Sequence, residues 1–130
     1  MLLTGKREKV VAESMLWVVI EYFARFMLAT IFLYAAIGKF VDTSTIQGFM
    51  ETNGIPGFLI WFAAATDIAI GISIISGYLW RMIIPLGAVY IIVLGLIFHL
   101  RPESPDDMVS LFKNLSLAGA MFLLIIRSKD

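Results

Sequence analysis

Cysteine is absent from this sequence, which excludes disulfides, thiol redox chemistry, iron–sulfur clusters and cysteine-ligated zinc. Histidine occurs once, as His99, so one chain cannot supply both ligands of a bis-histidine haem, and no metal site is expected. Charge is also scarce: Asp, Glu, Lys and Arg make up 15% of the residues, and ten basic side chains balance ten acidic ones. The composition therefore describes neither a soluble globule nor a protein that attracts nucleic acid.

Apolar residues are abundant instead, at 60% of the chain, and the mean hydropathy is +0.91. Four apolar windows stand out, at about 15–38, 57–76, 82–100 and 108–126. Each approaches the roughly 20 residues that a helix, rising about 1.5 Å per residue, needs to cross a hydrocarbon core about 30 Å thick. The sequence thus predicts an all-α membrane protein, in which a single domain at 15–126 forms a bundle of four transmembrane helices. Residues 1–14 are predicted to be a cytoplasmic N-terminal tail and residues 127–130 a C-terminal tail.

The connections between the windows contain signals for turns and for one further helix. Ser44 and Gln47 have the spacing of a capping box, and apolar residues at helical spacing continue until Gly54, which predicts a short interfacial helix between the first and second spans. Residues 77–81 form a short turn, so the second and third spans should be antiparallel neighbours. Asp107 is expected to cap the fourth helix.

Basic residues are distributed unevenly between the two sides of the predicted bundle. One side carries Lys6, Arg7, Lys9, Arg81, Arg127 and Lys129, and the other carries Lys39, Arg101 and Lys113. Loops rich in Lys and Arg stay in the cytoplasm. Both termini are therefore predicted to be cytoplasmic, and the protein to be integral to the cytoplasmic membrane.

Three charged residues fall inside the predicted spans, where an ionised side chain is costly. Glu21 and Arg25 are four residues apart on one helix, the spacing at which side chains meet, and Asp67 lies near the middle of the second span at a similar predicted depth. We therefore expect a network of these three residues that faces the bundle interior. Such a network either holds helices together or belongs to a functional site, and the residues leave both interpretations open.

Further polar residues are predicted to converge at the outer mouth of the bundle. At about 100° per residue, Lys39 lies only about 40° from Arg25 around the first helix, and His99 ends the stripe of the third helix that begins at Arg81. The fourth helix contributes two polar residues from its first turns. The predicted ligand-binding set is Lys39, His99, Lys113, Asn114, Arg25 and Asp67, and the predicted structural ion network is Glu21, Arg25, Asp67 and Arg81.

Two lysines and a histidine above an internal Arg–Asp pair would attract an anion, a carbonyl or a quinone head group. The alternative is that the two lysines reach toward lipid phosphates, that Arg81 anchors the inner rim and that His99 bonds water. No catalytic residue is assigned, because the spacing reveals no nucleophile with an adjacent base.

An ordered set of short motifs connects the four predicted spans. It consists of Arg25, Ile37-Gly38-Lys39-Phe40, Gly54-Ile55-Pro56, Asp67, Gly77 with Arg81, His99, and Phe112-Lys113-Asn114-Leu115. From about residue 23 to residue 126, the chain resembles the DoxX family of small four-helix bacterial and archaeal membrane proteins. The resemblance implies that domain 15–126 is a DoxX-like bundle with a signature polar set of Arg25, Lys39, Asp67, Arg81, His99, Lys113 and Asn114. The chain departs from the family pattern in two places: Asp67 stands where Glu is more usual, and Ala35-Ala36 where a glycine is common.

The resemblance also implies a relation to DoxD-like subunits of thiosulfate:quinone oxidoreductase and to membrane partners of redox enzymes. We therefore expect a membrane subunit of a quinone-linked redox system that holds a quinone or a small anion in a polar intramembrane site. A partner subunit would supply the electron carrier, and no covalent cofactor is expected. The alternatives are a non-catalytic structural or interaction module and, third, a small-solute carrier component, which would need a homo-oligomer because four helices enclose little room.

Overall fold

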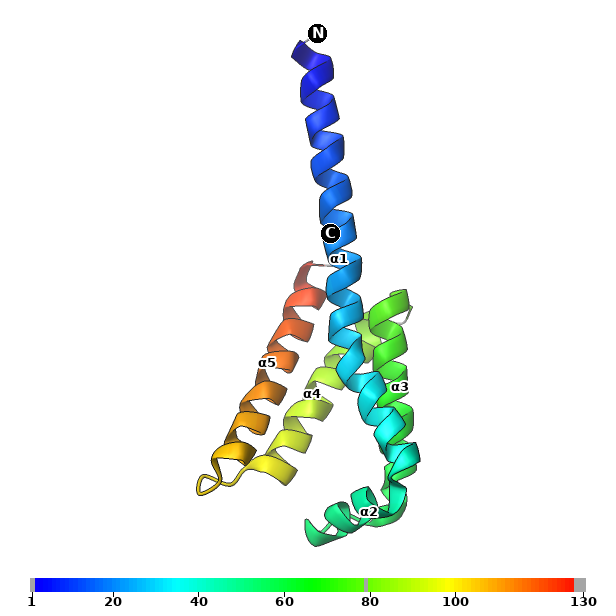
Figure 1. Cartoon of the computed structure of the whole chain (residues 1–130), viewed down its shortest axis with the longest axis vertical. Coiled ribbons are helices and arrows are strands. Elements are labelled where there is room, and N and C mark those ends of the chain that lie inside the picture. The colour runs from blue at the N-terminus through cyan, green and yellow to red at the C-terminus, as the bar shows by residue number, and fades with distance from the viewer. Residues whose placement is uncertain (1, 79, 128–130) are drawn as a thin grey trace.

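The computed structural model describes residues 2–78 and 80–127, and all regular structure in these two ranges is helical (Figure 1). The elements in chain order are α1 (Leu2–Val41), α2 (Thr43–Thr52), the short 3-10 helix η1 (Gly57–Leu59), α3 (Ile60–Ser76), α4 (Trp80–His99) and α5 (Pro105–Arg127). Within the described ranges, four segments are long and apolar enough to cross a membrane: Gly5–Val41, Gly57–Ser76, Arg81–His99 and Pro105–Ile126. The prediction of an all-α, four-span membrane protein with a short helix after the first span is confirmed.

The first helix is longer than the predicted span of 15–38. α1 contains 40 residues and so extends for about 60 Å, twice the thickness of a hydrocarbon core. The predicted tail, 1–14, is helical from Leu2 onward, because its Lys, Arg and Glu residues are good helix formers and charge alone does not end a helix. Of the predicted C-terminal tail, Arg127 ends α5 and 128–130 lie outside the described residues.

The short helix α2 begins differently from the prediction. Asp42 is its N-terminal cap residue and makes no side-chain capping bond, and Ser44 already lies inside the helix. The predicted capping box is therefore wrong, and Gln47 instead donates from its amide to the carbonyl of Gly57, at 3.2 Å. Gly54 follows the helix with φ of 81°, a left-handed conformation that glycine adopts without strain. α2 is thus tied to the start of the second span.

The ends of α3 and α5 follow ordinary capping chemistry. Gly77 has φ of 75° and donates to the carbonyl of Ser73 at 2.9 Å, so the chain reverses at once into α4, as predicted for antiparallel neighbours. α5 starts at Pro105, whose fixed φ suits the first helical turn. The backbone N–H of Asp107 donates to the hydroxyl of Ser104 at 3.3 Å. Ser104, and not the predicted Asp107, therefore caps α5.

The four long helices pack as two pairs, α1 with α3 and α4 with α5, which meet along a common core (Figure 1). The buried core residues are Ala29, Phe32, Ile70, Ile74, Ile84, Ala88, Ile91, Ala118 and Met121. The two pairs diverge toward the end of the bundle where α2 lies across the opening, which we name the α2 end. At the other end, the first half of α1 projects beyond its neighbours, and every residue from 5 to 24 is exposed.

Candidate functional site

An ion pair joins the last turn of α1 to the middle of α3. Lys39 Nζ lies 2.6 Å from Asp67 Oδ2, and the two side chains are only 15% and 5% exposed. The same ammonium approaches the carbonyl of Ala35 at 3.5 Å. Two buried opposite charges compensate each other, whereas either one alone would be costly in an apolar environment. The pair therefore fixes the register of α1 against α3 near the α2 end.

This pair replaces the predicted network of Glu21, Arg25 and Asp67. Arg25 does bond Glu21, at 2.5 Å, but it lies beside Gly77, where an added Cβ would be 3.6 Å from a guanidinium nitrogen. Gly77 is about 15 Å along α3 from Asp67, since the ten intervening steps each rise about 1.5 Å. The predicted pairing of Arg25 with Asp67 is wrong. The prediction placed Arg25 near the middle of a span at 15–38, but α1 continues far beyond residue 15, and Arg25 lies at the end of the bundle, level with Gly77.

Arg81 also lies away from the predicted network. It occupies the first turn of α4, at the end of the bundle opposite to α2, and its side chain is exposed. Among the described residues, no ion pair or hydrogen bond involves Arg81. The structure therefore does not place this residue in an ion network.

A cavity of about 410 Å³ opens between the diverging helix pairs at the α2 end, and we name it the central cavity. Its walls are largely apolar side chains from α2, α3 and α4. The polar residues that line it are Lys39, Thr66, Tyr90, His99 and Asn114. Three members of the predicted ligand-binding set, Lys39, His99 and Asn114, are thus brought together, with Asp67 behind Lys39. Their role in binding stays a prediction.

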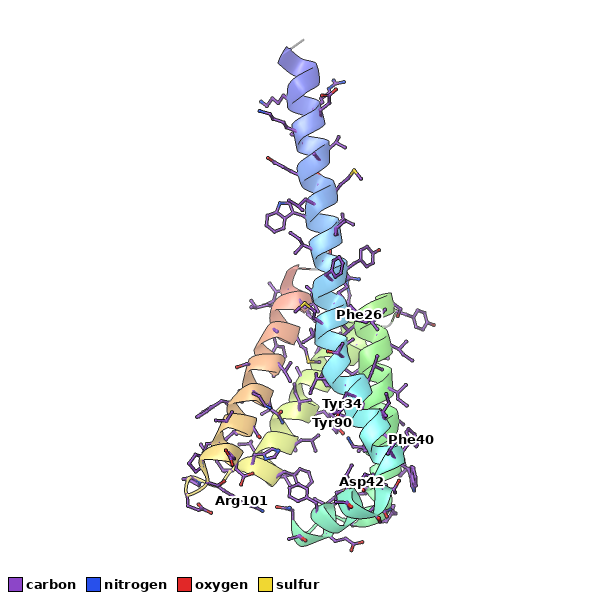
Figure 2. All side chains as sticks on the ribbon, in the orientation of Figure 1. Phe26, Tyr34, Phe40, Asp42, Tyr90 and Arg101 are labelled. Carbon is purple, nitrogen blue, oxygen red and sulfur yellow. The ribbon has the colours of Figure 1, made fainter. Side chains whose placement is uncertain are left out.

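Tyr90 is a polar residue of this cavity that the sequence interpretation missed. Its hydroxyl is shielded from solvent and has no hydrogen-bond partner within the described residues. Figure 2 shows Tyr90 in the space between α4 and α1. Tyrosines in membrane proteins usually lie at the two interfaces. The position of Tyr90 in the middle of an apolar span is therefore the feature of the sequence that could have indicated a site residue. A buried hydroxyl without a partner is unfavourable unless a ligand or water completes it.

A chain of polar contacts closes the α2 end, and we name it the polar latch: Asn53, His99, Arg101 and Asp107. His99 Nδ1 lies 3.0 Å from Asp107 Oδ1, and Arg101 lies 3.8 Å from the same carboxylate. Arg101 also donates to Asn53 Oδ1 at 2.8 Å, and Figure 2 shows it at the α4–α5 connection, on the side of α2. Stacking of Phe49 on Phe98, with ring centroids 5.3 Å apart, adds an apolar contact. These contacts hold α2 across the central cavity.

The two predicted polar residues of α5 have different environments. Asn114 Nδ2 donates to the carbonyl of Ile91 at 3.0 Å, and the absence of a side chain on Gly95 permits this close approach of α5 to α4. Lys113 does not line the central cavity. It lines a second, more open depression of about 730 Å³ beside α5, which we name the lateral groove, together with Ile31 of α1 and His99 of α4. Lys39 and Lys113 therefore line two different cavities, whereas His99 and Asn114 line both.

Comparison with known proteins places this chain in a family. A model of the DoxX family matches residues 21–100, which include α2, α3, α4 and the second half of α1. The chain is 27% identical, over 103 residues, to the inner membrane protein YqjF of Escherichia coli (strain K12), a match that covers 79% of each chain. No solved structure matches significantly. The match to the family model extends over more than half of the sequence and includes Lys39, Asp67, Tyr90 and His99, so the chain belongs to the DoxX family.

Proposed function

We propose that this membrane protein binds a neutral, largely apolar carbonyl compound of the quinone class in the central cavity. The observation that carries the proposal is Tyr90, which lines a largely apolar cavity and whose buried hydroxyl has no hydrogen-bond partner among the described residues. A cavity of about 410 Å³ falls in the size range of small-molecule sites, which combine apolar walls with a few placed polar groups.

The charges beside the cavity favour a neutral ligand over the small anion that the sequence also allowed. Lys39 is the cation on the wall, and Asp67 at 2.6 Å already compensates it. An anion would lose its hydration on entering and would meet a pair with little net charge. A carbonyl oxygen pays a smaller desolvation cost and can accept a hydrogen bond from Tyr90 and one from the remaining N–H of Lys39.

The wider role proposed for this site is that of a membrane subunit in a quinone-linked redox system. A quinone that binds here needs an electron donor or acceptor, and a partner subunit would supply it, because the chain has no cysteine and one histidine. The exposed first half of α1 supports such a partner or a second copy of the chain. Its apolar residues between 10 and 20 lie beyond the part of α1 that packs on α3, so they are available for packing against a partner.

We propose that both termini face the cytoplasm of a cytoplasmic membrane, on the basis of the distribution of basic residues. The chain has no cysteine, so single cysteines report sidedness without background. With a membrane-impermeant maleimide on intact cells, Glu103→Cys in the α4–α5 connection should be labelled, whereas Lys6→Cys should be labelled only after permeabilisation. The reverse pattern would invert the orientation.

The test of the proposed ligand is binding of a short-chain benzoquinone or naphthoquinone analogue to the purified full chain in detergent. Tyr90→Phe removes only the hydroxyl, and its Kd should rise about tenfold, the effect of losing one hydrogen bond worth about 1.4 kcal/mol. Tyr34→Phe is the matched control, because Tyr34 is 75% exposed and does not line the cavity.

The proposal fails if the wild-type chain binds neither analogue. It also fails if Tyr90→Phe and Tyr34→Phe bind with the same affinity as the wild type. Tighter binding of a carboxylate analogue than of the neutral quinone would show that the charge argument is wrong.

A further inference from the structure

The lateral groove differs from the central cavity in its charge. Lys113 is eight residues after Pro105, the first residue of α5, so its Cα lies about 12 Å along the helix. A span of this length reaches the headgroups at its ends, and Lys113 therefore lies inside the hydrocarbon region. Within the described part of the chain, Lys113 makes no ion pair and no hydrogen bond. A lysine at this depth is costly without a counter-charge. Unlike Lys39, it obtains none from the residues that the structure describes.

The two carboxylates at the start of the same helix do not compensate Lys113. Asp107 bonds His99 and faces Arg101. Asp106 is on the same stripe of α5 as Lys113 but seven residues earlier, a rise of about 10 Å. Among the described residues no carboxylate compensates Lys113, which leaves room for a counter-charge from a ligand.

The groove below Lys113 has the shape and chemistry of an acyl-chain site. It follows α5 from Val109 to Ala120, about 16 Å of helix, and Ile31 of α1 contributes to its wall. Most of its surface is apolar, although polar side chains also line it. The apolar residues are Ile31, Val109, Phe112, Leu117 and Ala120, and the polar ones besides Lys113 are His99, Ser110, Asn114 and Ser116. The groove exists because α1 packs on α3 and α5 packs on α4, which leaves the space between α1 and α5 open to the lipid.

We infer that the lateral groove binds one anionic membrane phospholipid, with the phosphate at Lys113 and an acyl chain along α5 toward Ala120. The phosphate supplies the missing counter-charge, and the long lysine side chain can extend upward to meet it. The apolar groove distinguishes this site from a lysine that contacts headgroups at random, because it holds the chain as well as the head. The inference does not depend on the ligand proposed for the central cavity.

Native mass spectrometry of the full chain released from nanodiscs tests the inference with two lipids, phosphatidylglycerol and phosphatidylcholine. The wild-type chain should retain one phosphatidylglycerol and no phosphatidylcholine. Lys113→Gln should lower the fraction that retains phosphatidylglycerol at least fivefold, and Lys113→Arg, which keeps the charge, should restore it. Lys9→Gln, in the exposed half of α1, should leave retention unchanged.

A second variant separates a built site from a lysine that merely reaches the headgroups. Ala120→Trp places a bulky side chain in the groove at an exposed position two turns from Lys113, and it should also abolish retention although the charge remains. Normal retention in Ala120→Trp, or in Lys113→Gln, would overturn the inference. Retention of added oleate with exclusion of phosphatidylglycerol would overturn it as well, because the ligand would then be a free fatty acid.

Discussion

The two halves of α1 belong to one continuous helix but have very different environments. Residues 5–24 are all exposed, and the ion pair of this end, Glu21 with Arg25, forms within the helix and includes a carboxylate side chain that is 53% exposed. In the second half, Ala29, Phe32 and Ala36 are buried against the bundle, and Lys39 pairs across to α3 with a carboxylate that is 5% exposed. One continuous helix therefore supplies both core residues of the bundle, with Lys39 on the wall of the central cavity, and an exposed surface.

This difference shows how to rank intramembrane charges. A pair four residues apart on one helix forms wherever the helix forms and contributes little. A pair between two helices exists only in one packing register, and here it lies on the wall of a cavity. The second kind is the better indicator of a site, and the predictions below compare the two halves directly.

The largest effect is expected for the ion pairs. Asp67→Asn leaves the ammonium of Lys39 without its carboxylate in a largely buried position, and we expect a loss of about 3–5 kcal/mol of stability. Glu21→Gln should cost about 0.5 kcal/mol or less, because its pair is exposed and local. Unfolding in mixed micelles by titration with SDS measures both.

Removing both charges is the control for this prediction. The double variant Lys39→Met with Asp67→Asn should recover most of the stability lost by Asp67→Asn alone, since no uncompensated charge remains. Equal losses for Asp67→Asn and Glu21→Gln would contradict the difference between the two halves of α1.

A smaller effect is expected for two phenylalanines of the same helix. Phe32 is 3% exposed and Phe23 is 66% exposed. Phe32→Ala leaves a void in the core and should cost about 2 kcal/mol, less than in a soluble protein because lipid is as apolar as the core. Phe23→Ala should change the unfolding midpoint by much less. A Phe23→Ala loss as large as that of Phe32→Ala would indicate that the first half of α1 is packed against something in the purified protein.

The smallest effect concerns two glycines. A Cβ on Gly71 would lie 2.7 Å from Cδ2 and 2.9 Å from Cγ of Leu33, whereas one on Gly5 would meet nothing within 4 Å. Gly71→Ala must displace the side chain of Leu33, so it should cost about 1 kcal/mol. Gly5→Ala should be neutral or slightly stabilising, since alanine favours a helix. The same SDS titration distinguishes them, and a stabilised Gly71→Ala would show that α1 and α3 are not in close contact there.

The four spans were predictable because length and hydropathy determine them locally. The second span, 57–76, matches the segment in the structure, since Gly57 and Gly77 mark its ends clearly. The first span was predicted too short, because Lys6, Arg7 and Lys9 look like a tail although they continue the helix. Hydropathy along the sequence therefore predicts that a transmembrane helix exists more reliably than it predicts where the helix begins and ends.

The partners of the charged residues were not predictable in the same way. Lys39 and Asp67 were both predicted as site residues, but their pairing depends on the register of α1 against α3, which no local pattern specifies. Lys113 was expected to join Lys39, yet the divergence of the two helix pairs places them at different cavities. Tyr90 was missed because an aromatic residue in an apolar segment is usually a packing residue. Its position in the middle of the span was a weak signal, which the buried hydroxyl without a partner among the described residues strengthens.

The infrared spectrum of a ¹³C-carbonyl-labelled quinone analogue bound to the full chain tests directly whether Tyr90 donates to a ligand in the central cavity. If Tyr90 and Lys39 bond the carbonyl in the central cavity, its stretching band should shift to lower frequency on binding, and part of that shift should disappear in Tyr90→Phe but not in Tyr34→Phe. Two results would contradict binding of the carbonyl by Tyr90. The band of the bound analogue could stay at the frequency that it has in detergent alone, or it could shift equally in the wild type and in Tyr90→Phe.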